Sequence, residues 1–337
     1  MISIVIPVLN EEEILPELHR RLTEAAPAWN EDFEVVLVDD GSTDRTLELV
    51  QEINAEDPRF RAISLARNFG HQTAISAGIH YAVGDCVIVM DADLQDPPEE
   101  LSRFLDKWRD GCDVVYGIRQ KRKEGIFKRS CYAVFYRILS FLSQIEIQLD
   151  AGDFCLMDRR VVNVLKSMPE SNRFVRGLRS WAGFRAEGVE YERHARAAGE
   201  VKYSFSKLLK LALDGVFSFS HVPLRMATYL GLITSALSFA GIVIFVILKL
   251  SDVHLFGRSF EDVPGWVSLV ALIAFIGGIQ LVMLGVLGEY IGRIFDEVKQ
   301  RPLWVVKEAC GFQPPLQNIP ESLPPVPATP RCDRTEK

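Results

Sequence analysis

The fold of this 337-residue chain is decided by the stretch Val87-Ile88-Val89-Met90-Asp91-Ala92-Asp93-Leu94-Gln95-Asp96-Pro97-Pro98. Four apolar residues run directly into three carboxylates, and two prolines follow. Such an apolar run predicts a buried strand, and open α/β sheets bind their ligands where strands end. On a continuing strand Asp91 and Asp93 would point to the same face. Paired carboxylates suit a divalent cation that carries phosphate oxygens; a plain acidic turn is the alternative.

The residues before about position 120 alternate apolar runs with helical patterns. Strands are predicted at residues 2–6, 34–38, 61–65, 85–90 and 113–116. A capping box from Asn10 to Glu13 predicts the first helix, a second follows around Leu47, a third covers residues 72–82, and Pro98 predicts the start of a fourth. Repeated strand–helix–strand units with short loops predict an α/β fold with a doubly wound, mostly parallel sheet.

A second predicted strand also ends in acids. Residues 34–38 run into Asp39-Asp40-Gly41-Ser42. Right-handed crossovers bring the carboxyl ends of parallel strands to one edge of the sheet, so Asp39 and Asp91 are expected on the same edge. Two acidic strand ends at one edge predict a nucleotide site assisted by Mg²⁺ or Mn²⁺.

The composition narrows the class of protein. With 45 acidic and 38 basic residues the net charge is −7, so a nucleic-acid partner is not expected. The six cysteines are scattered without a C-x-x-C pair, which argues against a structural zinc site or a disulfide framework and fits a reducing compartment. No signal peptide is visible ahead of the first predicted strand.

The composition changes from residue 206 onward. Residues 206–226 show a juxtamembrane amphipathic pattern, and residues 229–248 and 266–288 are two uncharged runs. About 20 helical residues at 1.5 Å each span a hydrocarbon core of about 30 Å. A two-helix transmembrane hairpin is therefore predicted within residues 227–292.

Basic residues predict the orientation of this hairpin. The loop between the two runs carries only Lys249 and Arg258, whereas Arg225, Arg293 and Lys299 lie on the other side. The positive-inside rule then places both termini in the cytoplasm and the protein in the inner (plasma) membrane. The expected organisation is a cytosolic domain at 1–205, juxtamembrane helices at 206–226, the hairpin, a cytosolic segment at 293–310 and a disordered, proline-rich tail at 311–337.

A basic loop follows the predicted sheet at residues 121–129, and an aromatic-rich helical pattern follows it at residues 131–142. That helix could lie in a membrane interface or pack as a core helix, and the sequence favours neither. A nucleotide site tethered to a membrane predicts a lipid-linked substrate. The basic loop could bind a lipid phosphate through charge-assisted hydrogen bonds.

Three segments resemble the signatures of family 2 glycosyltransferases with the GT-A fold: residues 4–11, residues 38–42 and residues 91–98. Residues 65–70 (Leu-Ala-Arg-Asn-Phe-Gly), Gly152-Asp153-Phe154 and the two predicted membrane helices narrow the resemblance. They look like polyprenyl-phosphate glycosyltransferases of the bactoprenol glucosyltransferase branch, which is related to dolichol-phosphate mannose synthases. The resemblance covers roughly residues 1–310.

The resemblance implies a role for individual residues. The nucleotide-sugar residues would be Pro7, Asn10, Glu11, Asp39, Asp91, Arg196 and Lys202. The metal ligands would be Asp91, Asp93 and Gln95, and the lipid phosphate would be bound by Arg119, Lys121, Lys128 and Arg129. Asp93 and Asp153 would be the catalytic acids, although Asp153 beside Gly152 could also be a simple turn residue. The family commonly has Tyr or Phe where this chain has Leu9, which leaves base stacking there unassigned.

The implied reaction transfers glucose from UDP-glucose to a polyprenyl phosphate such as undecaprenyl phosphate, with inversion, for cell-envelope glycosylation. The acceptor is already ionised near neutral pH, so Asp153 is expected to orient a substrate more than to remove a proton. UDP-GlcNAc, UDP-galactose, a 4-amino-arabinose derivative and GDP-mannose remain alternative donors. The resemblance also implies contacts with membrane lipids and a homo-oligomer such as a tetramer.

Two other functions compete with this reading. A processive polysaccharide synthase would carry a Q-x-x-R-W element, but Arg176 stands where Gln would precede Arg179. A non-catalytic membrane scaffold would not need acids at two strand ends.

Overall fold

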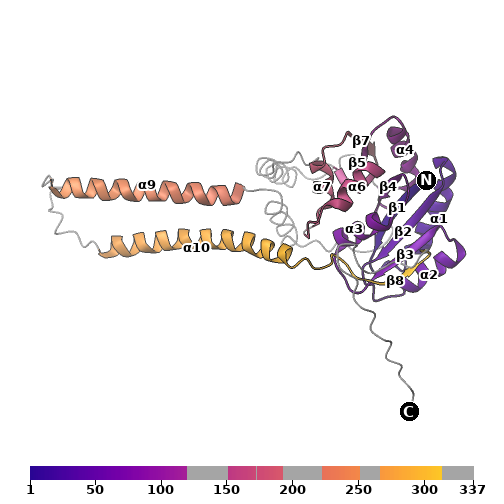
Figure 1. Cartoon of the computed structure of the whole chain (residues 1–337), viewed down its shortest axis with the longest axis horizontal. Coiled ribbons are helices and arrows are strands. Elements are labelled where there is room, and N and C mark those ends of the chain that lie inside the picture. Colours follow the sequence, from indigo (N-terminus) through magenta and orange to yellow (C-terminus); the bar gives the residue numbers. More distant parts are fainter. Residues whose placement is uncertain (120–150, 172, 193–221, 251–265, 313–337) are drawn as a thin grey trace, which may run out of the picture. The chain divides into compact units, whose positions relative to one another are not determined.

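The computed structural model describes residues 1–119, 151–171, 173–192, 222–250 and 266–312 (Figure 1). The chain divides into two compact units. One holds the sheet and comprises residues 1–122, 150–200 and 301–337, and the other holds two long helices and comprises residues 123–149 and 201–300. The sheet therefore contains chain from both sides of the helices in sequence.

The described strands form one eight-stranded sheet in the order β7-β5-β6-β4-β1-β2-β3-β8. They are β1 (Ile2–Val8), β2 (Phe33–Asp39), β3 (Phe60–Leu65), β4 (Cys86–Val89), β5 (Val114–Arg119), β6 (Ala151–Asp158), β7 (Ala186–Tyr191) and β8 (Val306–Cys310). β6 and β8 run antiparallel to their neighbours, and the other pairings are parallel. This mixed sheet with a parallel core confirms the predicted GT-A-like α/β class.

Helices cover both faces of the sheet (Figure 1). One face carries α1 (Leu15–Ala25), α2 (Thr46–Glu56) and α4 (Leu101–Arg109), and the other carries α3 (His71–Tyr81), α6 (Arg159–Ser167) and α7 (Val175–Trp181). Two short 3₁₀ helices, η1 (Ala26–Trp29) and η2 (Pro98–Glu100), complete the layer on the first face. β1 and β2 are buried along their whole length, because strands covered on both faces are apolar throughout rather than alternating.

The strand order reverses between β1 and β4. From β1 the chain builds outward through β2 and β3, and then crosses back by α3 to place β4 on the other side of β1. Ligands of doubly wound sheets bind outside the carboxyl ends of the strands at such a reversal. The loops after β1 and β4 therefore frame the expected site.

Two local predictions were wrong. α1 begins at Leu15 without a side-chain cap, because Asn10 adopts a left-handed conformation with φ 54° and its Oδ1 accepts a hydrogen bond from Thr43 N at 2.8 Å. β4 ends at Val89, so Asp91 and Asp93 lie in the following turn rather than on a continuing strand. The predicted start at Pro98 is confirmed by η2.

The strand β8 follows the second long helix and closes the edge of the sheet beside β3. Ile63 lies opposite Ala309 in this antiparallel pair, and Ala66 N donates a hydrogen bond to the Val305 carbonyl at 2.9 Å. The exposed backbone edge of β3 is thereby paired.

The second unit contains α9 (Val222–Leu250) and α10 (Trp266–Val298), which pack against each other. Large apolar side chains stay exposed on both helices; Leu237 is 68% and Leu281 is 71% exposed. Among the described residues, one segment, Phe275–Val298, is long and apolar enough to cross a membrane. The hairpin with two crossings stays a prediction.

Candidate active site

The loops after β1 and β2 are joined by hydrogen bonds. Asn10 N donates to Ser42 Oγ at 2.9 Å, and Glu11 N donates to Thr46 Oγ1 at 2.8 Å. Together with the Asn10 side chain, these bonds hold residues 9–11 against residues 42–46. Pro7 is buried in β1, so of the predicted nucleoside-pocket residues it is Asn10 and Glu11 that line this loop pair.

Asp39 and Asp40 shape the neighbouring loops. Asp39 is 2% exposed, and its two oxygens accept hydrogen bonds from Ser42 N at 2.9 Å and from the Ser64 hydroxyl at 2.8 Å. Asp40 accepts from Phe69 N at 2.7 Å and Gly70 N at 2.9 Å, which fixes the turn before α3. Burial raises the pKa of Asp40, although these two backbone donors oppose the shift. The base-reading role of Asp39 stays a prediction.

The turn after β4 carries the acidic signature. Asp93 and Gln95 are buried, and Asp93 Oδ1 accepts a hydrogen bond from Gln95 N at 3.1 Å. Leu94 between them has a positive φ of 54°. Asp96 is fully buried and accepts a hydrogen bond from the Tyr191 hydroxyl at 2.5 Å, which ties the turn to β7. The turn is thus held at both of its ends.

His71 is a residue that the sequence predictions missed. Its Nε2 lies 3.5 Å from Asp91 Oδ1 and 3.6 Å from Asp153 Oδ2. Partial burial lowers the pKa of His71, but its hydrogen bond to Asp153 and the charges of Asp91, Asp153 and Asp40 outweigh that effect and raise it. The available signal was its position, directly after the family-like stretch at residues 65–70 and at the start of α3.

Asp153 reaches this site from β6. β6 pairs antiparallel with β4, with Val89 opposite Cys155. That pair is the last one of the ladder, and Asp91 and Asp153 each lie two residues beyond it on their own segment. Asp153 therefore lies on a strand, and the alternative of a simple turn residue is wrong.

Donors from two helices surround the Asp153 carboxylate. Gln72 Nε2 donates at 3.1 Å and Arg176 Nη2 at 3.4 Å. Burial opposes ionisation of Asp153, but the hydrogen bond from His71 and the charges of Arg176, His71 and Arg179 outweigh it and hold the pKa of that carboxyl well below its usual range. Asp153 is consequently an ionised and weakly basic carboxylate.

Gln72 also connects the site to α7. Its Oε1 accepts a hydrogen bond from Val175 N at 2.9 Å, while its Nε2 binds Asp153. Arg179, one turn further along α7 than Arg176, is 4% exposed, and its Nη2 has no hydrogen-bond partner among the described residues. Two arginines of α7 thus bring positive charge to Asp153, and the sequence analysis identified them only as a departure from Q-x-x-R-W.

The turn after β4 has some of the features of a metal site. Asp91 Oδ1 is buried and has no hydrogen-bond partner among the described residues. The pKa of Asp91 is raised to about 6, because burial and the charges of Asp96, Asp153 and Asp93 outweigh the opposing charge of His71. The described ranges contain no group of three or more His, Cys, Asp or Glu side chains placed to hold a metal ion. Asp91, Asp93 and Gln95 therefore fit a partial ligand set that the phosphate oxygens of a substrate would complete.

The remaining predicted residues are placed in part. Arg119 is the last residue of β5, where its backbone pairs with Tyr191 of β7. Those outside the described residues are Lys121, Lys128, Arg129, Arg196 and Lys202. The structure therefore brings together the acids of three strand ends, and the acceptor-loop assignments stay predictions.

Comparison with known proteins places this arrangement in a family. Residues 3–165 match the family described as Glycosyl transferase family 2. The chain is 47% identical over 314 residues to the uncharacterized glycosyltransferase YkcC of Bacillus subtilis (strain 168), covering 92% of this chain and 94% of that one. It is 41% identical over 314 residues to the SfII prophage-derived bactoprenol glucosyl transferase of Shigella flexneri, covering 93% and 99%. It is 40% identical over 307 residues to the prophage bactoprenol glucosyl transferase homolog of Escherichia coli (strain K12), covering 91% and 98%.

A likeness to solved structures is weaker. The mannosyltransferase PcManGT from Pyrobaculum calidifontis, in complex with GDP-Man and Mn²⁺, is 14% identical with a TM-score of 0.40, covering 89% of this chain and 88% of that one. At this level of similarity nothing about its ligands transfers to this chain.

Proposed function

This chain belongs to glycosyl transferase family 2 and is a glycosyltransferase, and from that premise we propose that it transfers glucose from UDP-glucose to a polyprenyl phosphate at the cytosolic face of a membrane. The names of the bactoprenol glucosyl transferase relatives support both the lipid acceptor and the sugar. The proposed reaction inverts the anomeric carbon, because a single direct displacement joins acceptor and sugar.

The observation that carries this proposal is that His71 Nε2 lies close to the carboxylates of both Asp91 and Asp153. Asp91 belongs to the turn at the strand-order reversal, where a nucleotide donor binds in doubly wound sheets. Asp153 comes from β6 and carries the charges of α7 beside it. A donor-side acid and an acceptor-side acid on either side of one histidine fit a reaction between two bound substrates.

In the proposed step, a bond forms between a phosphate oxygen of the lipid and C1 of glucose. The bond from C1 to the diphosphate oxygen breaks, and its electron pair leaves with UDP. A phosphate monoester has its second pKa at about 6, so the acceptor is already ionised near neutral pH. No proton needs to be removed from it, which agrees with the weakly basic carboxylate of Asp153.

Asp153 therefore orients the acceptor or the sugar rather than acting as a base. Arg176 and Arg179 offset the repulsion between this carboxylate and an anionic acceptor. Asp91, Asp93 and Gln95 would hold Mg²⁺ or Mn²⁺, which when bound to the diphosphate acts as a Lewis acid for the leaving group. The buried Asp91 Oδ1, which accepts no hydrogen bond from a described residue and lies 3.5 Å from His71 Nε2, supports this assignment.

The sheet also supports the membrane hairpin. β3 precedes α9 and α10 in sequence, β8 follows them, and the two strands pair in one sheet. The chain must therefore cross a membrane an even number of times between them. If the apolar segment of α10 crosses the membrane, a second crossing is needed to make the number even. The uncharged residues 229–248 of α9 would form this second crossing. Positive charges at Arg225, Arg293 and Lys299 favour cytosolic ends.

The test incubates membranes containing the chain with undecaprenyl phosphate, Mg²⁺ or Mn²⁺, and one radiolabelled donor at a time: UDP-glucose, UDP-GlcNAc, UDP-galactose or GDP-mannose. We expect label in the organic-extractable lipid from UDP-glucose, dependent on the metal. Asp93→Ala should abolish the transfer and leave the protein folded. Transfer from another donor alone would replace glucose, and transfer from none of them would overturn the proposal.

A further inference from the structure

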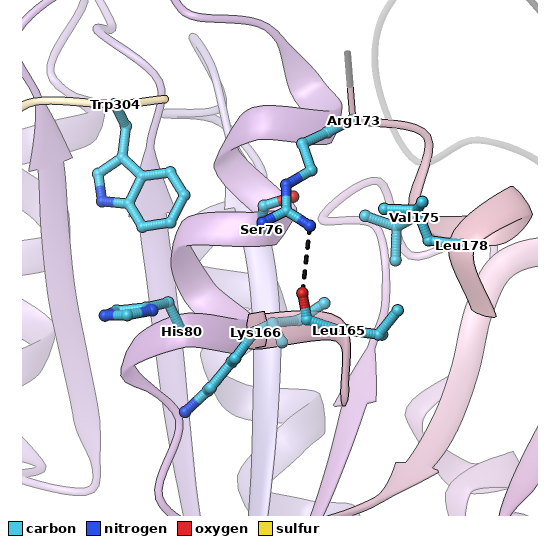
Figure 2. A pocket seen from close by; sticks show the side chains of 9 residues that line it. Ser76, His80, Leu165, Lys166, Arg173, Val175, Leu178 and Trp304 are labelled. Atoms are coloured by element: carbon cyan, nitrogen blue, oxygen red, sulfur yellow. Dashed lines mark hydrogen bonds between the residues drawn. The ribbon is translucent and has the colours of Figure 1, made fainter. Parts of the chain in front are cut away.

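A pocket lies on the α3 face of the sheet (Figure 2). Its walls come from α3, α6, the start of α7 and the segment that leads into β8. Ser76 and His80 lie one and two turns along α3 from Gln72, so the pocket begins about 6 Å from the catalytic end of that helix and extends away from it. None of its lining residues has a part in the proposed reaction.

The pocket has a cationic side. Lys166 of α6 and Arg173 line it, and His80 and Trp304 face each other at one end with ring centroids 5.6 Å apart (Figure 2). Arg173 Nη1 donates a hydrogen bond to the Leu165 carbonyl at 3.2 Å, which fixes its guanidinium at the pocket wall. The lining residues that the structure describes include no acidic side chain.

Lys166 is a half-buried cation without a counter-ion among the described residues. The pKa of Lys166 is lowered to about 8, because burial and the charge of Arg159 lower it and outweigh the opposing charge of Glu34. No described residue forms a hydrogen bond or ion pair with its ammonium. Glu34 is already engaged by Ser3 Oγ at 2.5 Å and by Arg61 at 2.8 Å. A half-buried ammonium without a counter-ion is costly, and a bound anion would relieve that cost.

The opposite wall of the pocket is apolar. Val175 and Leu178 of α7 lie there, on the side away from His80 and Trp304 (Figure 2), and Leu165 and Ile79 add further apolar lining. A ligand that fits both walls therefore carries an anionic group and an adjoining apolar or aliphatic part. Trp304, which follows the last residue of α10 by six positions, adds an aromatic side chain of the kind enriched at membrane interfaces.

We propose that this pocket is a second anion site, which binds a phosphate group between Lys166, Arg173 and His80 beneath the Trp304 indole. The phosphate group comes from an anionic phospholipid headgroup or from a soluble phosphate. Charge-assisted hydrogen bonds from the ammonium and the guanidinium hold it. The described lining residues include none of those assigned to the donor or the acceptor, and the occupancy of this site does not depend on the reaction proposed above.

The test uses the full chain in a non-ionic detergent, without a nucleotide or divalent metal. Inorganic phosphate, dihexanoyl phosphatidylglycerol and dihexanoyl phosphatidylcholine are titrated separately by calorimetry at constant ionic strength. We expect Lys166→Gln to weaken the binding of the preferred probe by about tenfold or more, because a charge-assisted hydrogen bond is lost. Lys166→Arg keeps the charge and should retain the binding, which separates charge from folding.

Lys307→Gln is the matched control, since it removes the same charge from an exposed position on β8. It should bind as the unaltered chain does. Tighter binding of phosphatidylglycerol than of phosphate and phosphatidylcholine identifies a lipid headgroup, and equal binding of phosphate and phosphatidylglycerol identifies a soluble phosphate. The proposed site is overturned if Lys166→Gln binds the preferred probe as tightly as the unaltered chain does. It is also overturned if Lys307→Gln loses as much affinity for that probe as Lys166→Gln does.

Discussion

The carboxylate of Asp153 receives donors from two helices, although it belongs to neither. Gln72 and His71 come from α3, and Arg176 comes from α7. This shell keeps Asp153 ionised and fixes its direction. The surrounding donors and cations are placed to bind a negative charge. A neutral amide of the same shape therefore cannot substitute for this carboxylate.

Asp153→Asn should therefore lower kcat by about a hundredfold or more, the range seen when a positioned catalytic group is lost. The expected KM for UDP-glucose changes less, because the donor-side residues remain. Initial rates of lipid labelling in membranes measure both quantities. Asp32→Asn, on an exposed loop, is the control, and near-normal turnover of Asp153→Asn at neutral pH would remove Asp153 from the mechanism.

Lys166 predicts a pH dependence of stability. Its pKa is about 8 in the folded chain against an ordinary value of 10.5, so the folded state binds the proton less readily than the unfolded state. Lys166 leaves the free energy of unfolding undiminished above pH 10.5, where it is neutral in both states. That free energy falls as the pH falls through 8, because the half-buried amine must then take up a proton. Lys166→Met should thus gain stability over the unaltered chain as the pH is lowered from about 10 to about 7.

Thermal unfolding in phosphate-free buffer measures this difference, so that no bound anion stabilises the ammonium. Lys307→Met should show no such pH-dependent gain, since that side chain is exposed. Parallel stability curves for Lys166→Met and the unaltered chain across this range would contradict the assignment.

At the scale of the element, α3 is the helix that links the site to the sheet. Its first turn carries His71 and Gln72, and its third turn contains Gly78, which lets the helix pack closely on β1. A Cβ at Gly78 would collide with Val5 Cγ1 and come within 3.1 Å of Val38 Cγ2. The height of α3 above the sheet, and with it the position of His71, depends on this glycine.

Gly78→Ala should destabilise the protein despite a helix propensity gain of about 1 kcal/mol. Overpacking against a full core costs about 1–3 kcal/mol, so a net loss is expected. Thermal unfolding measures it. In a Val5→Ala background the same substitution should cost less, because the colliding methyl group is gone. An equal cost in both backgrounds would show that the contact with Val5 is not the cause.

The sequence predicted β1 to β5 but missed β6, although helices cover both of its faces. β1, β2 and β4 are mainly apolar, with Ser3 and Glu34 as buried polar residues in β1 and β2, and the acids at the ends of β2 and β4 could be placed at one edge from handedness alone. β8 could not be predicted in this way, because an edge strand exposes Lys307 and Glu308 and carries no apolar pattern. His71 acquires its importance only from Asp153, which lies 82 residues away in sequence, so no local pattern marks it.

At the scale of the whole molecule, the catalytic sheet is not one continuous stretch of sequence. Its edge strand comes after both long helices, and the predicted domain limits at 1–205 leave that strand out. β8 covers the backbone of β3, which would otherwise present unpaired N–H and C=O groups to other chains. The unit that holds the sheet therefore needs residues on both sides of the helices.

Two truncations test this requirement. Removal of residues 313–337 should leave the thermal stability unchanged, whereas removal of residues 306–337 should lower it and promote aggregation, because the edge of β3 is opened. Thermal unfolding and size-exclusion chromatography in detergent measure the two effects. The same stability for both truncated chains would mean that β8 contributes nothing to the sheet.

The position of β8 also sets the order of events during translation. The ribosome makes β3 long before β8, and both hydrophobic helices leave it in between. The sheet is thus completed only after the helices have been made. In the proposed hairpin, a copy that inserted with a single crossing would leave β8 on the opposite side of the bilayer from β3, and the edge of β3 would stay unpaired. Pairing of β8 with β3 would therefore distinguish a chain with two crossings from a chain with one.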